Sequence, residues 1–322
     1  MSEPQSPQVS NEVTESWQQA VQGILGLVVL IGAVAMFHYY SPSATQNPQP
    51  DELHQRVQQL SQQVAQLEQQ QATPALVLSR YRNSIGYIYG IYQVGFPDKP
   101  AAIRARVSGT GFLVADQLLA TNRHVAEPWY GDVEAETLIQ RGAKPVLESL
   151  VVFFPGSPTP VALTPGAVSS SEDLAVLRID VKEKDAVRGL SVLPLGKAAA
   201  LPGEPVTVIG YPMGIAGMVA KSPTGIYQRL AYRHGDITAA SELAALSLIR
   251  PSTTCGHLGD VVGEKLIYDA PTAHGGSGGP VFNSHAEVIG VNSAYIDGFS
   301  GGTLGVSIEA LRPLIAAAEK EP

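Results

Sequence analysis

The sequence has little cysteine, little basic charge, and no lysine or arginine at all before Arg56. Its single cysteine, Cys255, cannot form an intrachain disulfide, so the folded domain must be stable without such bridges. The 21 basic residues are outnumbered by 29 acidic ones and form no cluster, which leaves a formal net charge of -8. Because binding to a phosphate backbone requires lysine and arginine to displace counterions, we do not expect nucleic acid as a partner.

The composition is typical of a turn-rich β-protein. Hydrophobic residues make up 44% of the 322 positions, with 32 glycines and 24 prolines. From Ser84 onward, short β-rich runs such as GTGFLVA and PVTVIGYP alternate with glycine and proline. We therefore expect one all-β domain of about 200 to 250 residues, with appendages before it.

A long apolar run near the N-terminus predicts a transmembrane helix. Residues 23–37 contain no polar side chain, and residues 21–40 match the roughly 20 residues that cross a bilayer, with Trp17, Tyr39 and Tyr40 as interfacial anchors. A cleaved signal peptide is the alternative, but it would need a basic start and a small-residue cleavage site, and neither is present. Without flanking positive charge, the sequence does not set the orientation.

A linker and a helical stalk are expected next. Residues 41–50 (SPSATQNPQP) are typical of a flexible linker, and residues 51–71 carry apolar side chains at alternating spacings of four and three. These side chains are Leu53, Val57, Leu60, Val64 and Leu67. The seam favours a short parallel coiled coil, which tethering to a bilayer would help to form. A solvated helical spacer remains the alternative.

Three segments carry reactive side chains in the order histidine, aspartate, serine. His124 lies in ATNRHVA, Asp173 in EDLAVL and Ser277 in GGSGGP. A serine hydroxyl needs a base to accept its proton, and an imidazole needs a carboxylate to fix its tautomer. We therefore interpret the three as a catalytic triad, with Glu172 as the alternative acid. The glycines around Ser277 allow the backbone amides of Gly275 and Ser277 to form an oxyanion hole.

The order of these residues discriminates between two hydrolase folds. Gly-x-Ser-x-Gly also fits the nucleophile elbow of α/β-hydrolases, where the acid and the histidine follow the serine. Only residues 278–322 follow Ser277 here, and His285 is the single histidine among them. The order found is that of the chymotrypsin fold.

Five segments in sequence resemble the trypsin-like peptidases, and most closely their HtrA/Deg branch. They are TGFLVADQLLATNRHV, EDLAVLRIDV, LPLGKAAALPGEPVTVIGYPMG, YDAPTAHGGSGGPVFN and VIGVNSA. The resemblance implies two six-stranded β-barrels, at about 84–200 and 201–322. It also implies His124 as general base, Asp173 as its orienting acid, Ser277 as nucleophile and no cofactor.

The sequence departs from related proteases in two respects. Digestive and clotting proteases carry an aspartate directly before the serine, where this chain has Gly276, so activation by pairing with a new N-terminus is not expected. HtrA relatives usually carry PDZ domains after the protease, but only residues 303–322 follow the last motif. We therefore expect no PDZ domain.

The residues expected to contact substrate lie on both sides of the nucleophile: Thr272, His274, Asn292, Ser293 and Ala294. Six positions before Ser277, where an aspartate would select arginine or lysine, stands Pro271. Asp269 matches an acidic residue found both in the HtrA relatives and in glutamate-specific bacterial proteases. Its charge therefore does not indicate which substrate residue is preferred. We predict cleavage after small or medium aliphatic residues such as Val, Ala or Ile.

No metal site is expected, because Cys255 and His257 alone make too few ligands. Cys255 is interpreted as an unpaired, buried thiol. The hypothesis is a membrane-anchored serine endopeptidase with an N-terminal tail at 1–20 and a protease domain at 72–322. The domain would lie outside the cytoplasm, act on proteins or peptides, and self-associate through the stalk. The alternatives are a catalytically silent, membrane-tethered peptide-binding scaffold, and an esterase using the same triad.

Overall fold

The structure is a computed structural model that describes residues 26–39, 50–197, 199–233, 236–295 and 302–320. The chain divides into two units, residues 1–64 and 65–322. In the first unit, residues 26–39 form a helix whose side chains are all exposed. Within the described ranges, no helix is both long enough and apolar enough to cross a membrane. Residues 21–25 and 40 of the predicted span lie outside the described residues.

Helix α2 (Pro50–Tyr81) runs ten residues past the predicted end of the stalk. Thr73, Val77 and Tyr81 follow at intervals of four, which places them on one face, and all three are buried. The Thr73 hydroxyl donates to the Ser284 carbonyl (2.8 Å). The end of α2 is therefore part of the packed second unit. The five seam side chains are exposed by 52% to 58% in the single chain.

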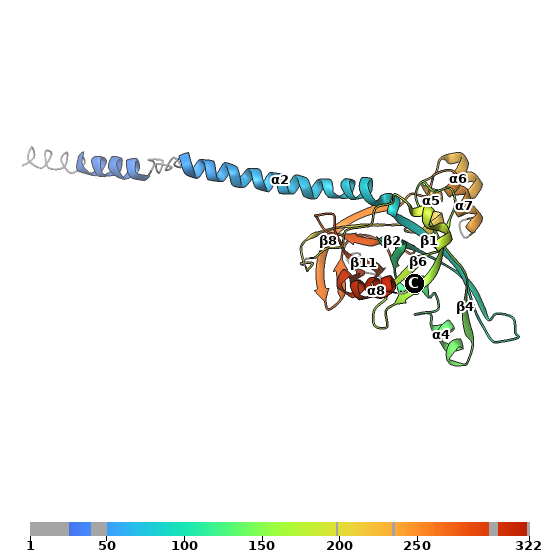
Figure 1. The fold of residues 1–322 in the computed structure, drawn as a ribbon. Helices are drawn as coiled ribbons and strands as arrows, with labels where there is room; N and C mark the ends of the chain where they lie inside the picture. The colour runs from blue at the N-terminus through green and yellow to red at the C-terminus, as the bar shows by residue number, and fades with distance from the viewer. Residues whose placement is uncertain (1–25, 40–49, 198, 234–235, 296–301, 321–322) are drawn as a thin grey trace, which may run out of the picture. The chain divides into compact units, whose positions relative to one another are not determined.

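The second unit contains two closed six-stranded barrels (Figure 1). The first has the order β1-β2-β3-β6-β5-β4 and the second β10-β11-β12-β9-β8-β7. The strands of the first are β1 (Ile85–Gly95), β2 (Ile103–Ala115), β3 (Leu118–Thr121), β4 (Lys144–Phe153), β5 (Val161–Val168) and β6 (Ala175–Ile179). Those of the second are β7 (Pro205–Gly210), β8 (Ser252–Val262), β9 (Lys265–Tyr268), β10 (Pro280–Phe282), β11 (Val288–Tyr295) and β12 (Thr303–Ser307). The prediction of two six-stranded barrels is confirmed.

Helices occupy several connections between the strands, which the all-β prediction did not include; α8 instead follows the last strand. Helices α5, α6 and α7 lie together between β7 and β8 (Figure 1). Their bounds are Gly214–Ala220, Thr224–Leu230 and Ile237–Ala245. The other helices are α3 (Arg123–Ala126), α4 (Val133–Gln140), α8 (Ile308–Lys320), η1 (Arg82–Ser84) and η2 (Val181–Val187).

One hydrophobic cluster is shared by the two barrels. It contains Phe112 and Val176 from the first barrel and Ile209 and Phe282 from the second, each fully buried. Because interior side chains interdigitate at high density, a shared cluster holds the barrels in one arrangement. The prediction of a buried thiol was wrong: Cys255 is exposed, on the outward side of β8.

Candidate active site

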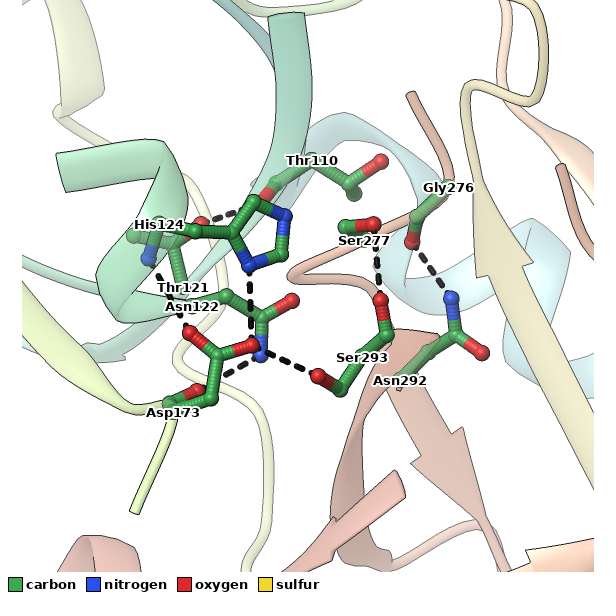
Figure 2. Close-up of polar contacts among 9 residues, drawn as sticks. All are labelled: Thr110, Thr121, Asn122, His124, Asp173, Gly276, Ser277, Asn292 and Ser293. Carbon is green, nitrogen blue, oxygen red and sulfur yellow. Dashed lines mark hydrogen bonds and ion pairs between the residues drawn. The ribbon is translucent and has the colours of Figure 1, made fainter. Parts of the chain in front are cut away.

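The pairing of β3 with β6 brings His124 and Asp173 together. His124 lies in α3, directly after β3, and Asp173 lies just before β6, which pairs with β3 as far as Thr121 and Ala175. The ring Nδ1 of His124 is 2.8 Å from Oδ2 of Asp173, and the His124 amide donates to Oδ1 at 3.0 Å (Figure 2). The carboxylate thus holds Nδ1 and leaves Nε2 on the other edge of the ring.

The Asp173 carboxylate is largely buried but well supplied with donors. The Ser293 hydroxyl donates to Oδ2 at 2.6 Å, and the His124 amide donates to Oδ1. The Asn122 side-chain amide holds the same residue through its backbone carbonyl, at 2.8 Å. Burial raises the pKa of Asp173, but the hydrogen bonds and charge of His124, with help from Ser293, outweigh burial and leave the pKa below its ordinary value. Asp173 is therefore ionised at neutral pH.

Ser277 lies on the loop between β9 and β10, facing the same space as the imidazole (Figure 2). Its hydroxyl donates to the Ser293 carbonyl at 2.8 Å. Among the described contacts there is no hydrogen bond from this hydroxyl to His124. The three predicted residues are thus assembled, but the Ser277 hydroxyl must leave the Ser293 carbonyl before it donates to Nε2.

The amide of Gly275 is oriented by the peptide that precedes it. The carbonyl of His274 accepts a hydrogen bond from the Met213 amide (2.6 Å). In a planar trans peptide the N–H points away from the carbonyl, so the Gly275 N–H faces the opposite side, away from Met213. Gly275 has a φ of +89°, and a Cβ there would lie 2.5 Å from the Tyr211 carbonyl. Only glycine suits this position.

Thr110, which the sequence analysis did not single out, fixes the nucleophile loop. This fully buried residue of β2 donates its amide to the Ser277 carbonyl and its hydroxyl to the Gly275 carbonyl, both at 2.7 Å. The hydroxyl also accepts from the Tyr211 amide at 3.1 Å. Its only sequence signal was its place in the TGFLVA segment. A residue of the first barrel thus positions the loop of the second.

Gly278 offers a test of this close packing. Its φ is +86°, and a Cβ would lie 2.0 Å from the Thr110 carbonyl. We expect Gly278→Ala to lower the free energy of unfolding by about 3 kcal/mol or more, because backbone strain adds to a clash that rigid neighbours cannot relieve. Gly189→Ala is the control: its φ is +84°, but no atom lies within 4 Å of the added Cβ. It should cost only about 1 to 2 kcal/mol in urea unfolding. Equal losses for the two variants would contradict the packing argument.

Asn292, predicted to contact substrate, is fully buried beneath the nucleophile loop. Its amide nitrogen donates to Thr272 Oγ1 (3.0 Å) and to the Gly276 carbonyl (2.9 Å), and its oxygen accepts from the Tyr268 hydroxyl (2.7 Å). A Cβ at Gly276 would lie 2.5 Å from Thr272 Oγ1. An aspartate at position 276 therefore does not fit this arrangement.

The other residues predicted to contact substrate lie around Ser277. His274 and Ala294 are exposed, and Ser293 is half-buried, with its hydroxyl on Asp173. A cavity of about 700 Å³ opens beside Ser277 and has walls from both barrels. Its lining includes His124, Asp173, His274, Gly275 and Ser277. In the described part of the chain, no group of three or more His, Cys, Asp or Glu could hold a metal ion.

Two closed barrels, with a histidine–carboxylate pair on the first and a glycine-flanked serine on the second, define the chymotrypsin-like architecture. The profile of the trypsin-like peptidase domain family matches residues 109–291. This match covers more than half of the chain, so the protein belongs to the trypsin-like peptidase family.

Curated proteins that are similar to this chain are serine proteases, and several of them carry HTRA or DegP-like names. The chain is 32% identical over 195 residues to serine protease PepD of Mycobacterium tuberculosis, covering 59% of this chain and 34% of that protein. It is 29% identical over 216 residues to the mitochondrial serine protease HTRA2 of Bos taurus, covering 66% and 37%. The chain thus matches about a third of the length of these relatives.

A solved structure agrees on the fold. The crystal structure of the serine endoprotease from Yersinia pestis matches with a TM-score of 0.50 and 18% identity. The match covers 77% of this chain and 67% of that one. At this identity, the likeness supports the fold alone.

Proposed function

We propose that this chain is a serine endopeptidase with Ser277 as nucleophile, His124 as general base and Asp173 as the acid that orients the histidine. The observation that carries the proposal is the 2.8 Å contact between His124 Nδ1 and Asp173, which leaves Nε2 on the side of Ser277. The orientation of the Gly275 amide adds a donor for the oxyanion.

The mechanism follows from these positions. Once it has left the Ser293 carbonyl, Ser277 Oγ attacks the substrate carbonyl carbon and passes its proton to His124 Nε2. The carbonyl oxygen becomes an oxyanion, which the Gly275 and Ser277 amides stabilise. The imidazolium, held by the Asp173 carboxylate, protonates the departing amine and leaves an acyl-enzyme. Water then gives a proton to His124 Nε2 as it attacks the acyl carbon. His124 returns this proton to Ser277 Oγ as the acid product leaves. The chemistry uses only protein groups, so we propose that no cofactor is needed.

Reaction with a fluorophosphonate separates this function from a silent peptide-binding scaffold, because only an activated serine is modified. We expect stoichiometric labelling of the intact chain and blocking of casein hydrolysis by the label. The site of labelling, read by mass spectrometry, should be Ser277. Failure to label would favour the scaffold. Peptide and ester substrates compared side by side would distinguish a peptidase from an esterase.

We propose that the residue before the scissile bond is small or medium aliphatic, such as Val, Ala or Ile. Support comes from Pro271, which stands where an aspartate would select arginine or lysine. The buried Asn292 has no charged partner among its described hydrogen bonds, which are to Thr272, Gly276 and Tyr268. Asp269 is engaged elsewhere, since its Oδ1 accepts from the His257 amide. A peptide-library digest dominated by cuts after Arg, Lys or Glu would contradict this preference.

We also propose the organisation of the appendages. Residues 1–20 would form a tail, 21–40 a membrane anchor, 41–50 a linker and 51–71 a self-associating stalk, with the protease domain at 72–322 outside the cytoplasm. Supporting the anchor, side chains such as Leu30 and Phe37 are exposed by 62% and 75%. Protease protection in sealed vesicles tests the orientation, and cytoplasmic exposure of residues after Tyr40 would overturn it.

A further inference from the structure

Arg106, which has no ion-pair partner among the described residues, borders the cavity beside Ser277. Arg106 lies on β2, is exposed, and lines the cavity of about 700 Å³ together with His124 and Ser277. Within the described residues, no carboxylate lies within 4.0 Å of its guanidinium. Its neighbour Arg104, two residues earlier on the same strand, is different, because Glu148 accepts from its guanidinium at 2.7 to 3.2 Å. Arg104 does not line the cavity beside Ser277.

Three acidic residues lie in this region, and each is held by other groups. Asp173 lines the same cavity and binds His124 and Ser293. Asp132 lines the same cavity, but its Oδ1 caps α4 by accepting from the Ala135 amide at 2.9 Å.

Asp236 lines an adjacent cavity of about 410 Å³ that also borders Arg106. Its carboxylate accepts from the amide and the hydroxyl of Thr238 at 2.9 and 2.7 Å. These bonds to Thr238, with a smaller contribution from the nearby charge of Arg106, lower the pKa of Asp236. Arg106 lines the cavity beside Ser277 without a direct contact to a carboxylate of the described residues.

The cavity lies on the leaving-group side of the scissile bond. The side chain before that bond is expected against β11, at Ser293 and Ala294, and neither residue is among those that line the cavity. The departing amine must instead approach His124 Nε2, which gives it a proton. The walls of the cavity beyond His124 come from β2 and from Tyr130 and Asp132. Residues that follow the scissile bond would thus pass in front of Arg106.

We propose that Arg106 selects substrates with an acidic residue within the first three positions after the scissile bond. A guanidinium binds a carboxylate through two parallel N–H donors, and the opposite charges strengthen both hydrogen bonds. A neutral amide, such as the side chain of Gln, gains no such charge attraction. Because Arg106 is exposed, the preference should be modest and sensitive to salt. This inference rests on the proposed peptidase function and adds a substrate class to it.

The test uses the full chain and peptides that carry Val before the scissile bond and either Glu or Gln at each of the next three positions. We expect kcat/KM to favour Glu about fivefold at one position, and the ratio to fall toward one as NaCl rises from about 0.05 to 0.5 M. Arg106→Gln should bring the Glu-to-Gln ratio of kcat/KM to one, and Arg106→Glu should invert it in favour of Gln. Arg104→Gln should keep the ratio of the parent. Equal ratios in the parent and Arg106→Gln would overturn the proposal.

A binding measurement keeps this inference separate from the proposed function. The affinity of Ser277→Ala for the same labelled peptides, measured by fluorescence anisotropy, needs no turnover. We expect about fivefold tighter binding of the Glu peptide, lost when Arg106→Gln is added. If casein hydrolysis and fluorophosphonate labelling were absent but this difference remained, the peptidase function alone would fail. Labelling and hydrolysis without any difference between Glu and Gln would reject the role of Arg106 alone.

Discussion

Ser277→Ala should reduce kcat on casein or a peptide by about 10⁵- to 10⁶-fold while leaving the fold intact. The loss is large because the hydroxyl forms the covalent intermediate, which no other group of the described site can replace. The structure explains why folding should survive, since the half-buried hydroxyl makes one hydrogen bond, to the Ser293 carbonyl. Steady-state hydrolysis and thermal unfolding, measured on the same preparation, check both statements.

Ser79→Ala is the matched control for this substitution. Its hydroxyl is exposed on α2 and bonds only to the carbonyl of Leu76 in the same helix. Activity of this variant should equal that of the parent. If Ser277→Ala still cleaved casein at the parent rate, the assignment of the nucleophile would be wrong.

Asp173→Asn should lower kcat/KM by about 10⁴-fold at neutral pH. An amide in place of the carboxylate can donate to Nδ1, which favours the wrong imidazole tautomer and removes the charge that stabilises the imidazolium. The backbone contact to the His124 amide can be kept by the remaining oxygen, so the local structure should persist. Glu172→Gln is the control, and it should change kcat/KM less than twofold. The reverse pattern would identify Glu172 as the orienting acid.

The same pair of variants has a pH signature. Because the pKa of Asp173 lies below its ordinary value in the folded protein, its carboxylate stabilises the fold above about pH 4, and this contribution disappears as the pH falls through the lowered pKa. The free energy of unfolding should therefore fall on acidification by a larger amount in the parent and in Glu172→Gln than in Asp173→Asn. Urea unfolding at pH 7 and at about pH 3 measures this difference.

The double barrel could be predicted because the sequence patterns that indicate strands are short, local and repeated along the chain. Short apolar runs such as PVTVIG and LAVLRI have the length of strands, and the order of His124, Asp173 and Ser277 separates two hydrolase folds. The helices between β7 and β8 were missed although they carry ordinary signals. Asp236 caps α7, whose sequence ITAASELAA is a good helix former. These helices were not predicted because the all-β assignment rested on the turn-rich composition of the whole chain.

The contacts that arrange the site could not be predicted, because they join residues far apart in the chain. Ser293 was expected to contact substrate, yet its hydroxyl bonds Asp173 at a separation of 120 positions and its carbonyl holds the Ser277 hydroxyl. Asn292 was expected to contact substrate as well, but the barrel closure buries it under Gly276. Such roles depend on which strands become neighbours in the fold. The spacing of residues in the sequence does not predict these neighbours.

The position of Thr110 links enzymatic competence to the completion of folding. Its amide and hydroxyl belong to the first barrel, and the two carbonyls they bind belong to the loop that carries the nucleophile. During synthesis the first barrel emerges before Ser277 exists, and the second barrel has no support for its loop until the two dock. Until the barrels dock, these two hydrogen bonds cannot form, so we expect a half-folded chain to hold the Ser277 loop loosely and to have little activity.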